Sequence, residues 1–131
     1  MAAKTYPVKI ITNASLKEIY DLYGRAKIFW SASGYGVDEE KNPLGVEHFG
    51  MTVVEAMAGG CIPLVYKAGG QKESVSNGEN GYLWESPKEL VAKTNNLVQD
   101  LKLLKRISTI AKQDSLKFSY EHFEKEFLSL L

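Results

Sequence analysis

Two glutamates with seven residues between them, Glu47 and Glu55, bracket the segment of the chain best suited to bind a ligand. Gly50, Met51 and Thr52 lie between them and open a helix, so their backbone N–H groups are free donors at the positive end of its dipole. Such an end suits a phosphate. The two carboxylates should instead accept hydrogen bonds from hydroxyls on either side of that anion. A nucleotide-sugar, with its sugar and its ribose flanking a pyrophosphate, has this layout.

The helix itself, expected over residues 52–58, is predicted to be buried on nearly every side, because apolar residues surround Glu55. A carboxylate left unpaired in that setting would cost several kcal/mol, so Glu55 should face a fixed partner or a ligand. The alternative for Glu55 is a surface carboxylate or a structural ion pair. Taken alone, Glu47 could be a solvated loop residue.

The elements expected to position this segment alternate between strands and helices. Short β-branched or apolar runs predict strands at residues 8–12, 28–32, 62–66 and 82–84. Capping boxes, apolar periodicity and glycine stops predict helices at residues 16–24, 52–58, 87–98, 101–112 and 120–130, with a helical turn at 73–76. The alternation predicts an α/β fold, a short parallel sheet with helices on both faces.

Several side chains are expected to build the core of this fold. The first helix carries Leu16, Ile19, Tyr20 and Tyr23 at the spacing of one buried stripe. Trp30 and Trp84 are most simply core residues, and Cys61 is expected to be a small buried hydrophobe. The acidic run Asp38–Glu40 is interpreted as a solvated loop, with a bound cation as the alternative.

Composition excludes several classes of function. The 131 residues carry 16 Lys and Arg against 16 Asp and Glu, and this net charge of zero excludes a strongly basic nucleic-acid surface. One cysteine and two histidines cannot form a structural zinc site, and His48 is expected to pack or hydrogen-bond, although its place beside Glu47 leaves acid–base chemistry open. The length of 131 residues predicts one domain, residues 1–131. The absence of a long apolar run and of paired cysteines predicts a reducing cytoplasm.

The motifs together resemble those of the group 1 (family 4) glycosyltransferases of GT-B fold. The resemblance rests on the Glu-x7-Glu motif of Glu47 and Glu55, with Phe49-Gly50-Met51 inside it and Glu-Ala-Met-Ala at its end. Further motifs follow in the family's order and spacing: Pro63 in the next strand, Gly69, Gly70 and Glu73 in a Gly-Gly-x-x-Glu loop, and the turn Asn77-Gly78-Glu79-Asn80-Gly81. They cover the chain from Val8 to Leu130.

The resemblance implies a role for each matched residue. Glu47 would contact hydroxyls of the donor sugar near the reacting carbon, as the catalytic residue. Gly50, Met51 and Thr52 would hold the diphosphate and Glu55 the ribose, with the Gly69–Gly70 loop also at the donor site. The family transfers a sugar from a nucleotide diphosphate-sugar with retention of configuration and needs no metal or cofactor. Its acceptors are glycans or lipid-linked molecules, as in polysaccharide biosynthesis.

The chain departs from the family in two respects. Residues 34–46 form an insertion like that of the dolichol-linked mannosyltransferases, which suggests a lipid-linked or polysaccharide acceptor. A complete enzyme of this family has two Rossmann-like domains. This chain resembles only the later part of the second domain, and it lacks the Arg and Lys residues that bind phosphate in that domain. We therefore expect a truncated donor-binding domain, inactive alone, from an enzyme of the cytoplasm or the cytoplasmic membrane face. The exposed edge of residues 28–32 would favour a homodimer.

A second function from another class stays open. The chain could be a non-catalytic nucleotide-sugar-binding module that acts with a separate acceptor-binding subunit. Within the enzyme class, starch, glycogen or sucrose-type synthesis is an alternative to cell-envelope or lipid-linked glycan assembly.

Overall fold

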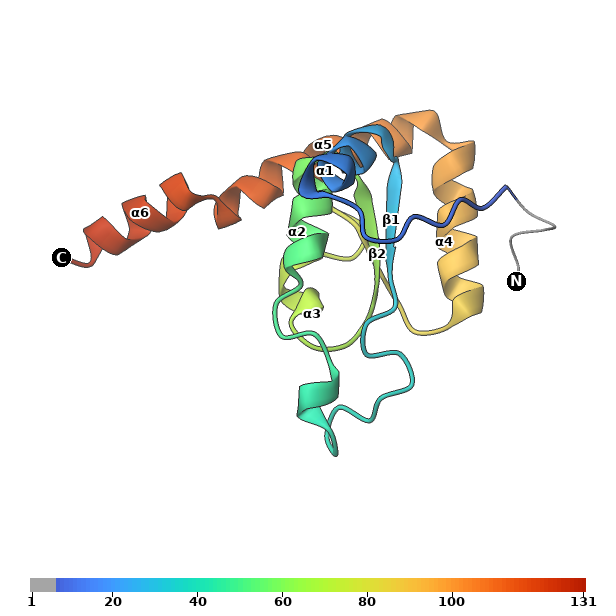
Figure 1. Ribbon diagram of the computed structural model, residues 1–131, viewed down its shortest axis with the longest axis horizontal. Coiled ribbons are helices and arrows are strands. Elements are labelled where there is room, and N and C mark those ends of the chain that lie inside the picture. Colours follow the sequence, from blue (N-terminus) through green and yellow to red (C-terminus); the bar gives the residue numbers. More distant parts are fainter. Residues whose placement is uncertain (1–6) are drawn as a thin grey trace.

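The computed structural model describes residues 7–131. Its strands are β1 (Ile28–Ser31), β2 (Ile62–Tyr66) and β3 (Tyr82–Trp84). Its α-helices are α1 (Leu16–Arg25), α2 (Met51–Ala58), α3 (Gln71–Ser74), α4 (Pro87–Gln99), α5 (Leu101–Ser115) and α6 (Tyr120–Ser129), and short 3-10 turns cover Pro43–Gly45 and Leu116–Phe118. Figure 1 shows the helices gathered around a small sheet, with α6 extending away from it.

The sheet has three parallel strands in the order β1-β2-β3. Successive side chains of β2 point to opposite faces. On one face Val65 packs with Val53 and Met57 of α2, and on the other Ile62 and Leu64 pack with side chains of α4 and α5. The α/β fold with helices on both faces is therefore confirmed, and β2 is the buried central strand.

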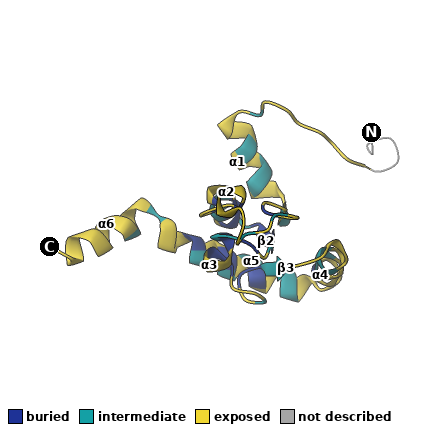
Figure 2. Cartoon of the chain, turned by 90° about the horizontal axis from the view of Figure 1, so that it is seen from below, coloured by how far each residue is buried: buried dark blue, intermediate teal, exposed yellow. Residues whose placement is uncertain are grey.

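Three of the four expected strands form, and residues 8–12 do not. A strand requires partners for its backbone N–H and C=O groups, and within residues 7–131 no strand lies beside this segment. Residues 8–12 are exposed instead, and Figure 2 shows the segment running away from the body of the molecule. The strand order leaves β1 at an edge of the sheet, as expected.

The helices begin where the caps predict. Ser15 and Glu18 form a reciprocal capping box, while Ser86 and Asp100 accept hydrogen bonds from the first turns of α4 and α5. Helix α5 continues beyond residue 112 to Ser115, because Ala111 and Ser115 are still buried. The short helix α3 lies two residues earlier than the expected turn.

Parts of the expected core are wrong. Helix α1 buries none of its residues, and Leu16 and Tyr20 are 68% and 53% exposed, because α2 covers α1 only in part. Trp30 on the edge strand is likewise 54% exposed and donates a hydrogen bond from Nε1 to Thr94 Oγ1. Trp84 is buried as expected, with its Nε1 donating to the Leu64 carbonyl.

Cys61 is buried, as expected for a small hydrophobe, and burial raises the pKa of its thiol. None of the helices in residues 7–131 is long and apolar enough to cross a bilayer.

Candidate functional site

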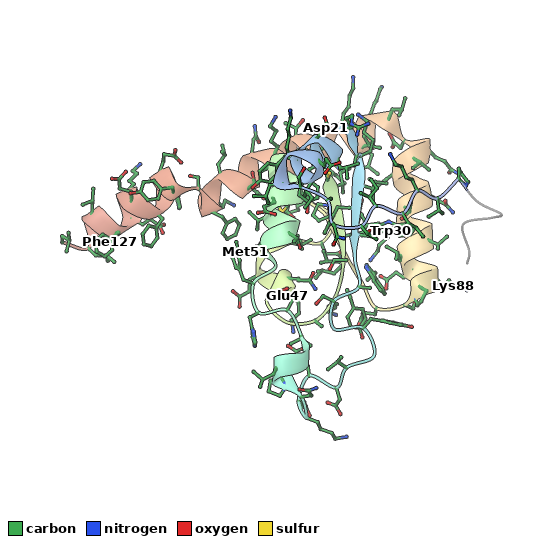
Figure 3. All side chains as sticks on the ribbon, in the orientation of Figure 1. Asp21, Trp30, Glu47, Met51, Lys88 and Phe127 are labelled. Atoms are coloured by element: carbon green, nitrogen blue, oxygen red, sulfur yellow. The ribbon has the colours of Figure 1, made fainter. Side chains whose placement is uncertain are left out.

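The start of α2 lies at the carboxyl edge of the sheet. The segment that leaves β1 leads into α2, and the segment that leaves β2 leads through Gly69 and Gly70 into α3. Because the carboxyl ends of parallel strands share one edge, both segments meet there, and ligands of open α/β sheets bind at this edge. Figure 3 shows Glu47 and Met51 together near this end of α2, with Asp21 of α1 toward the opposite end.

Gly50 sets the direction of the first turn of α2. Its φ of +81° lies in the left-handed region, which favours glycine, and it caps the helix without a side chain. Among the described residues, the amides of Met51 and Thr52 donate no backbone or side-chain hydrogen bond, and both residues are exposed. The helix therefore presents free N–H donors and the positive end of its dipole to solvent.

The Gly69–Gly70 loop packs directly against the backbone before α2. The amide of Gly70 donates to the Glu47 carbonyl oxygen at 2.8 Å. A Cβ atom on Gly69 would lie 2.2 Å from that same oxygen, and one on Gly70 would lie 1.7 Å from the His48 carbonyl oxygen. Only glycine permits this approach, so both glycines hold the backbone of Glu47 in place.

Glu47 combines a fixed backbone with a free side chain. Its residue is exposed, and its Oε1 accepts only a long hydrogen bond of 3.4 Å from the Phe49 amide among the contacts of residues 7–131. The carboxylate can therefore accept hydrogen bonds from a ligand beside the start of α2. The neighbouring His48 is also exposed, and its side chain makes no hydrogen bond among residues 7–131, so the expectation that it packs or hydrogen-bonds is wrong.

Glu55 lies one turn further along α2, half-buried. The expectation of a helix buried on every side is wrong, because Met51, Thr52 and Ala58 are exposed. The covered parts of α2 face the sheet, α1 and α5. Among residues 7–131 the Glu55 carboxylate has neither a hydrogen bond nor an ion pair, so the structural ion pair is not seen. Tyr23 and Glu55 line the same hollow between α1 and α2, and burial and then the negative charge of Glu55 raise the pKa of Tyr23.

The insertion at residues 34–46 folds onto the glycine loop. Glu39 Oε1 accepts a hydrogen bond of 3.1 Å from the Gly69 amide, and Glu39 Oε2 lies 3.3 Å from Lys72 Nζ. The interpretation of the acidic run as a solvated loop is therefore wrong for Glu39. Its carboxylate occupies a small anion-binding position made by one amide and one ammonium group. Asp38 pairs with Lys41 at 3.0 Å, and this hydrogen bonding lowers the pKa of Asp38.

A family model for "Glycosyl transferases group 1" matches residues 6–114, most of the chain. The chain belongs to this family. No curated protein matches it.

Solved structures of the Anabaena protein Alr3699/HepE share the fold. Anabaena Alr3699/HepE in complex with UDP aligns with a TM-score of 0.56 and 31% identity over 65% of this chain and 25% of that chain. The same protein in complex with UDP-glucose aligns with a TM-score of 0.54 at 31% identity, again over 65% and 25%. The present glycosyltransferase chain therefore spans about a quarter of the length of HepE.

In this group 1 glycosyltransferase chain the structure brings most of the expected site residues to one place. Glu47, Gly50, Met51, Thr52, Gly69 and Gly70 meet at the start of α2. Glu55 lies apart from them, one turn up the helix. The amides of Gly69 and Gly70 are already engaged, by Glu39 and by the Glu47 carbonyl.

Sequence reasoning missed two residues directly after the glycines. Gln71 is fully buried, accepts a hydrogen bond of 2.8 Å from Ser31 Oγ and donates to the Ser33 carbonyl, so it ties the end of β1 to α3. Lys72 supplies a cation beside the site. Their position directly after the Gly69–Gly70 pair is the sequence feature that could have indicated their place at the site. Arg25, by contrast, pairs with Asp21 on α1.

Proposed function

We propose that this chain is the donor-binding part of a retaining glycosyltransferase that transfers a hexosyl group from a nucleotide diphosphate-sugar to a glycan or lipid-linked acceptor. The observation that carries the proposal is the pair of free amides at the start of α2, set between two carboxylates that have no ion-pair partner among residues 7–131. Support comes from HepE, a relative of similar fold, whose structures contain UDP and UDP-glucose.

The residue roles follow the order of the donor's own parts. Gly50, Met51 and Thr52 bind the diphosphate through the helix start. Glu47, before the helix, accepts hydrogen bonds from sugar hydroxyls near the reacting carbon, and Glu55, after the first turn, accepts them from the ribose.

The glycine loop serves the same site in two ways. Gly69 and Gly70 hold the Glu47 backbone through their close approach. A phosphate group could displace the Glu39 carboxylate and bind the Gly69 amide and Lys72 in its place. Phosphate and carboxylate are both anions that accept hydrogen bonds from such groups.

Catalysis in this proposal rests on stabilising the departing diphosphate and positioning the acceptor, without a metal. The oriented amides of α2 and the Lys72 ammonium group lie where negative charge develops on the leaving group. Because the chain spans about a quarter of HepE, we propose that acceptor binding belongs to the rest of a longer enzyme and that this chain alone is inactive. We propose a cytoplasmic location for that enzyme.

The deciding experiment is calorimetric binding of UDP and UDP-glucose to the chain and its variants. Glu55→Ala should weaken both ligands by roughly tenfold to a hundredfold, the effect of losing hydrogen bonds to a charged group. Glu47→Ala should weaken UDP-glucose more than UDP, because UDP lacks the sugar. Glu124→Ala, on the projecting helix α6, is the matched control. Unchanged affinity in Glu55→Ala would remove the ribose role. If neither UDP nor any other nucleoside diphosphate bound the unaltered chain in the same assay, the proposal would be refuted.

The free edge of β1 supports a second, smaller proposal about assembly. Within residues 7–131 the only strand paired with β1 is β2, and Trp30 of β1 is 54% exposed. An edge of this kind offers unpaired backbone groups to another chain. We propose that two copies pair through β1.

A further inference from the structure

The outer face of α5 concentrates positive charge in a chain whose net charge is zero. Lys102, Lys105 and Lys112 follow one another at the three- and seven-residue spacing of a single helix face, and Arg106 lies beside them. All four residues are exposed, and none of them forms an ion pair within residues 7–131. The helix therefore presents four cations to solvent without a neutralising partner.

The carboxylates closest in sequence to this face are engaged elsewhere. Asp114 is the one acidic residue within α5, and its side chain binds Asn80 and Lys117. Asp100, directly before the helix, accepts hydrogen bonds from backbone amides of the first turn. Neither carboxylate pairs with a cation of the exposed face.

A polar hollow of about 280 Å³ lies beside the same face. Lys27, Lys105 and Lys112 line it together with the hydroxyl-bearing Ser108 and Thr109, and no acidic side chain takes part. The ends of α1 and α2 also border the hollow, and each adds only about half a negative charge through its dipole. Three ammonium groups outweigh both, so the hollow suits a phosphate group.

An apolar hollow of about 290 Å³ adjoins the polar one, and Lys27 and Lys105 line both. The apolar hollow is formed by Leu101 and Leu104, with Lys102 beside them. Leu101 is 71% exposed, although it is a large apolar residue. Exposed leucine bordered by lysines is typical of helices that lie on membranes, where apolar groups enter the bilayer and the cations meet headgroups.

Residue types on this face favour a lipid surface over other polyanions. Neither α5 nor either hollow contains an aromatic residue. Single-stranded nucleic acids stack on aromatic side chains, and protein interfaces are enriched in Tyr and Trp and depleted in Lys. Lysines around exposed leucine instead complement the negative surface of an anionic bilayer.

We propose that the outer face of α5, together with Lys27, binds the surface of a bilayer that contains anionic phospholipid. A headgroup phosphate occupies the polar hollow, and Leu101 enters the boundary between headgroups and acyl chains. Lys27 directly precedes β1, so this surface lies at the amino edge of the sheet, opposite the start of α2 (Figure 1). Membrane binding would therefore leave the proposed donor site open, and the inference does not depend on that site.

The test is sedimentation with phosphatidylcholine vesicles that contain or lack phosphatidylglycerol. The unaltered chain should bind only the anionic vesicles. The double variant Lys102→Gln and Lys105→Gln should bind them roughly 25-fold more weakly, because each cation near an anionic surface contributes about fivefold. Lys88→Gln with Lys125→Gln, which removes two exposed lysines elsewhere, is the matched control and should bind normally.

A second pair of variants tests the apolar contact. Leu101→Gln should weaken binding to the anionic vesicles, because it removes the group that enters the bilayer. Leu44→Gln, at an 82% exposed position of the insertion, should not. Thermal unfolding followed by circular dichroism should give the same midpoint for all variants, since every altered side chain is exposed.

Four results would overturn the proposal. The first is no binding to anionic vesicles, or equal binding to pure phosphatidylcholine. The second is an equal loss in the two double lysine variants, which would separate binding from α5. The third is release from vesicles by inorganic phosphate at the concentration of the lipid phosphate, which would indicate a site for a free anion. The fourth is a poly-glutamate peptide that binds with the same dependence on Lys102 and Lys105 while vesicles do not, which would indicate an acidic protein partner.

Discussion

The amide of Gly70 donates a 2.8 Å hydrogen bond to the carbonyl oxygen of Glu47, across 23 positions of the sequence. This contact joins the segment after β2 to the segment before α2. It holds the backbone of Glu47 while its carboxylate remains exposed.

Gly70→Ala should disrupt this junction. The new Cβ atom would lie 1.7 Å from the His48 carbonyl oxygen, and a backbone oxygen cannot rotate away as a side chain can. We expect the free energy of unfolding to fall by about 1–3 kcal/mol, as for other overpacked sites, and UDP-glucose binding to weaken. Urea denaturation and calorimetry measure the two effects. Gly24→Ala, where a Cβ atom meets nothing within 4 Å, is the control, and equal stability of the two variants would contradict the prediction.

Glu39→Ala should strengthen the binding of UDP. The substitution frees the Gly69 amide and the Lys72 ammonium group from the carboxylate that now occupies them. A phosphate would then bind without displacing an internal anion. Titration calorimetry at low and high salt checks this, because the gain should shrink as salt screens the charges. Glu40→Ala, whose exposed side chain lies in the same loop, is the control. A weaker UDP complex in Glu39→Ala would mean that Glu39 organises the loop for the ligand.

Asn80→Ala should destabilise the turn before β3. The buried Asn80 amide accepts a hydrogen bond from the Ser76 amide and donates to the Ser74 carbonyl and to Asp114 Oδ2 at 2.9 Å. Alanine leaves those buried groups without partners, at a cost of about 1–3 kcal/mol in unfolding free energy. Denaturant unfolding measures the change, with the exposed Asn95→Ala on α4 as control. A loss no larger than that of the control would argue against the role of this turn.

Acidification should weaken the junction between β3 and α4 through Glu89. Hydrogen bonds from the Lys93 side chain and then the Glu85 amide lower the pKa of Glu89 below its usual 4.5. A folded-state pKa below the unfolded one stabilises the fold above pH 4.5, and this contribution is lost as pH falls through the folded value. Unfolding free energy measured from about pH 6 to about pH 3 should therefore fall less steeply in Glu89→Gln. Glu124→Gln on α6 is the control and should leave the slope unchanged.

Trp30→Lys should abolish pairing through β1. A lysine on an edge strand opposes strand addition by another chain, because its charge would have to be desolvated. Light scattering over a concentration series should show dimers of the unaltered chain and monomers of the variant. Leu44→Lys, at an 82% exposed position of the insertion, is the control. A strictly monomeric unaltered chain at high concentration would contradict the proposal.

Local sequence signals predicted the regular elements well. The caps at Ser15 and Ser86 fix helix starts because side chain and backbone lie three residues apart. The apolar run at residues 62–66 became the central strand, since every side chain there can be buried. Residues 8–12 have an equally good strand pattern but do not form a strand. A strand also needs a neighbouring strand for its backbone hydrogen bonds, and the residue pattern does not show whether one is present.

The sequence alone determined the spacing of Glu47 and Glu55 around a helix start and the order of the motifs, because those properties follow from helix geometry and the linear chain. Only the tertiary structure shows that Gly70 donates a hydrogen bond to the Glu47 carbonyl and that Glu39 accepts one from the Gly69 amide. It also shows that Glu55 borders a cavity between α1 and α2. Each of these is a contact between distant segments. Such contacts depend on which segments the packed core brings close together, and local residue patterns do not predict them.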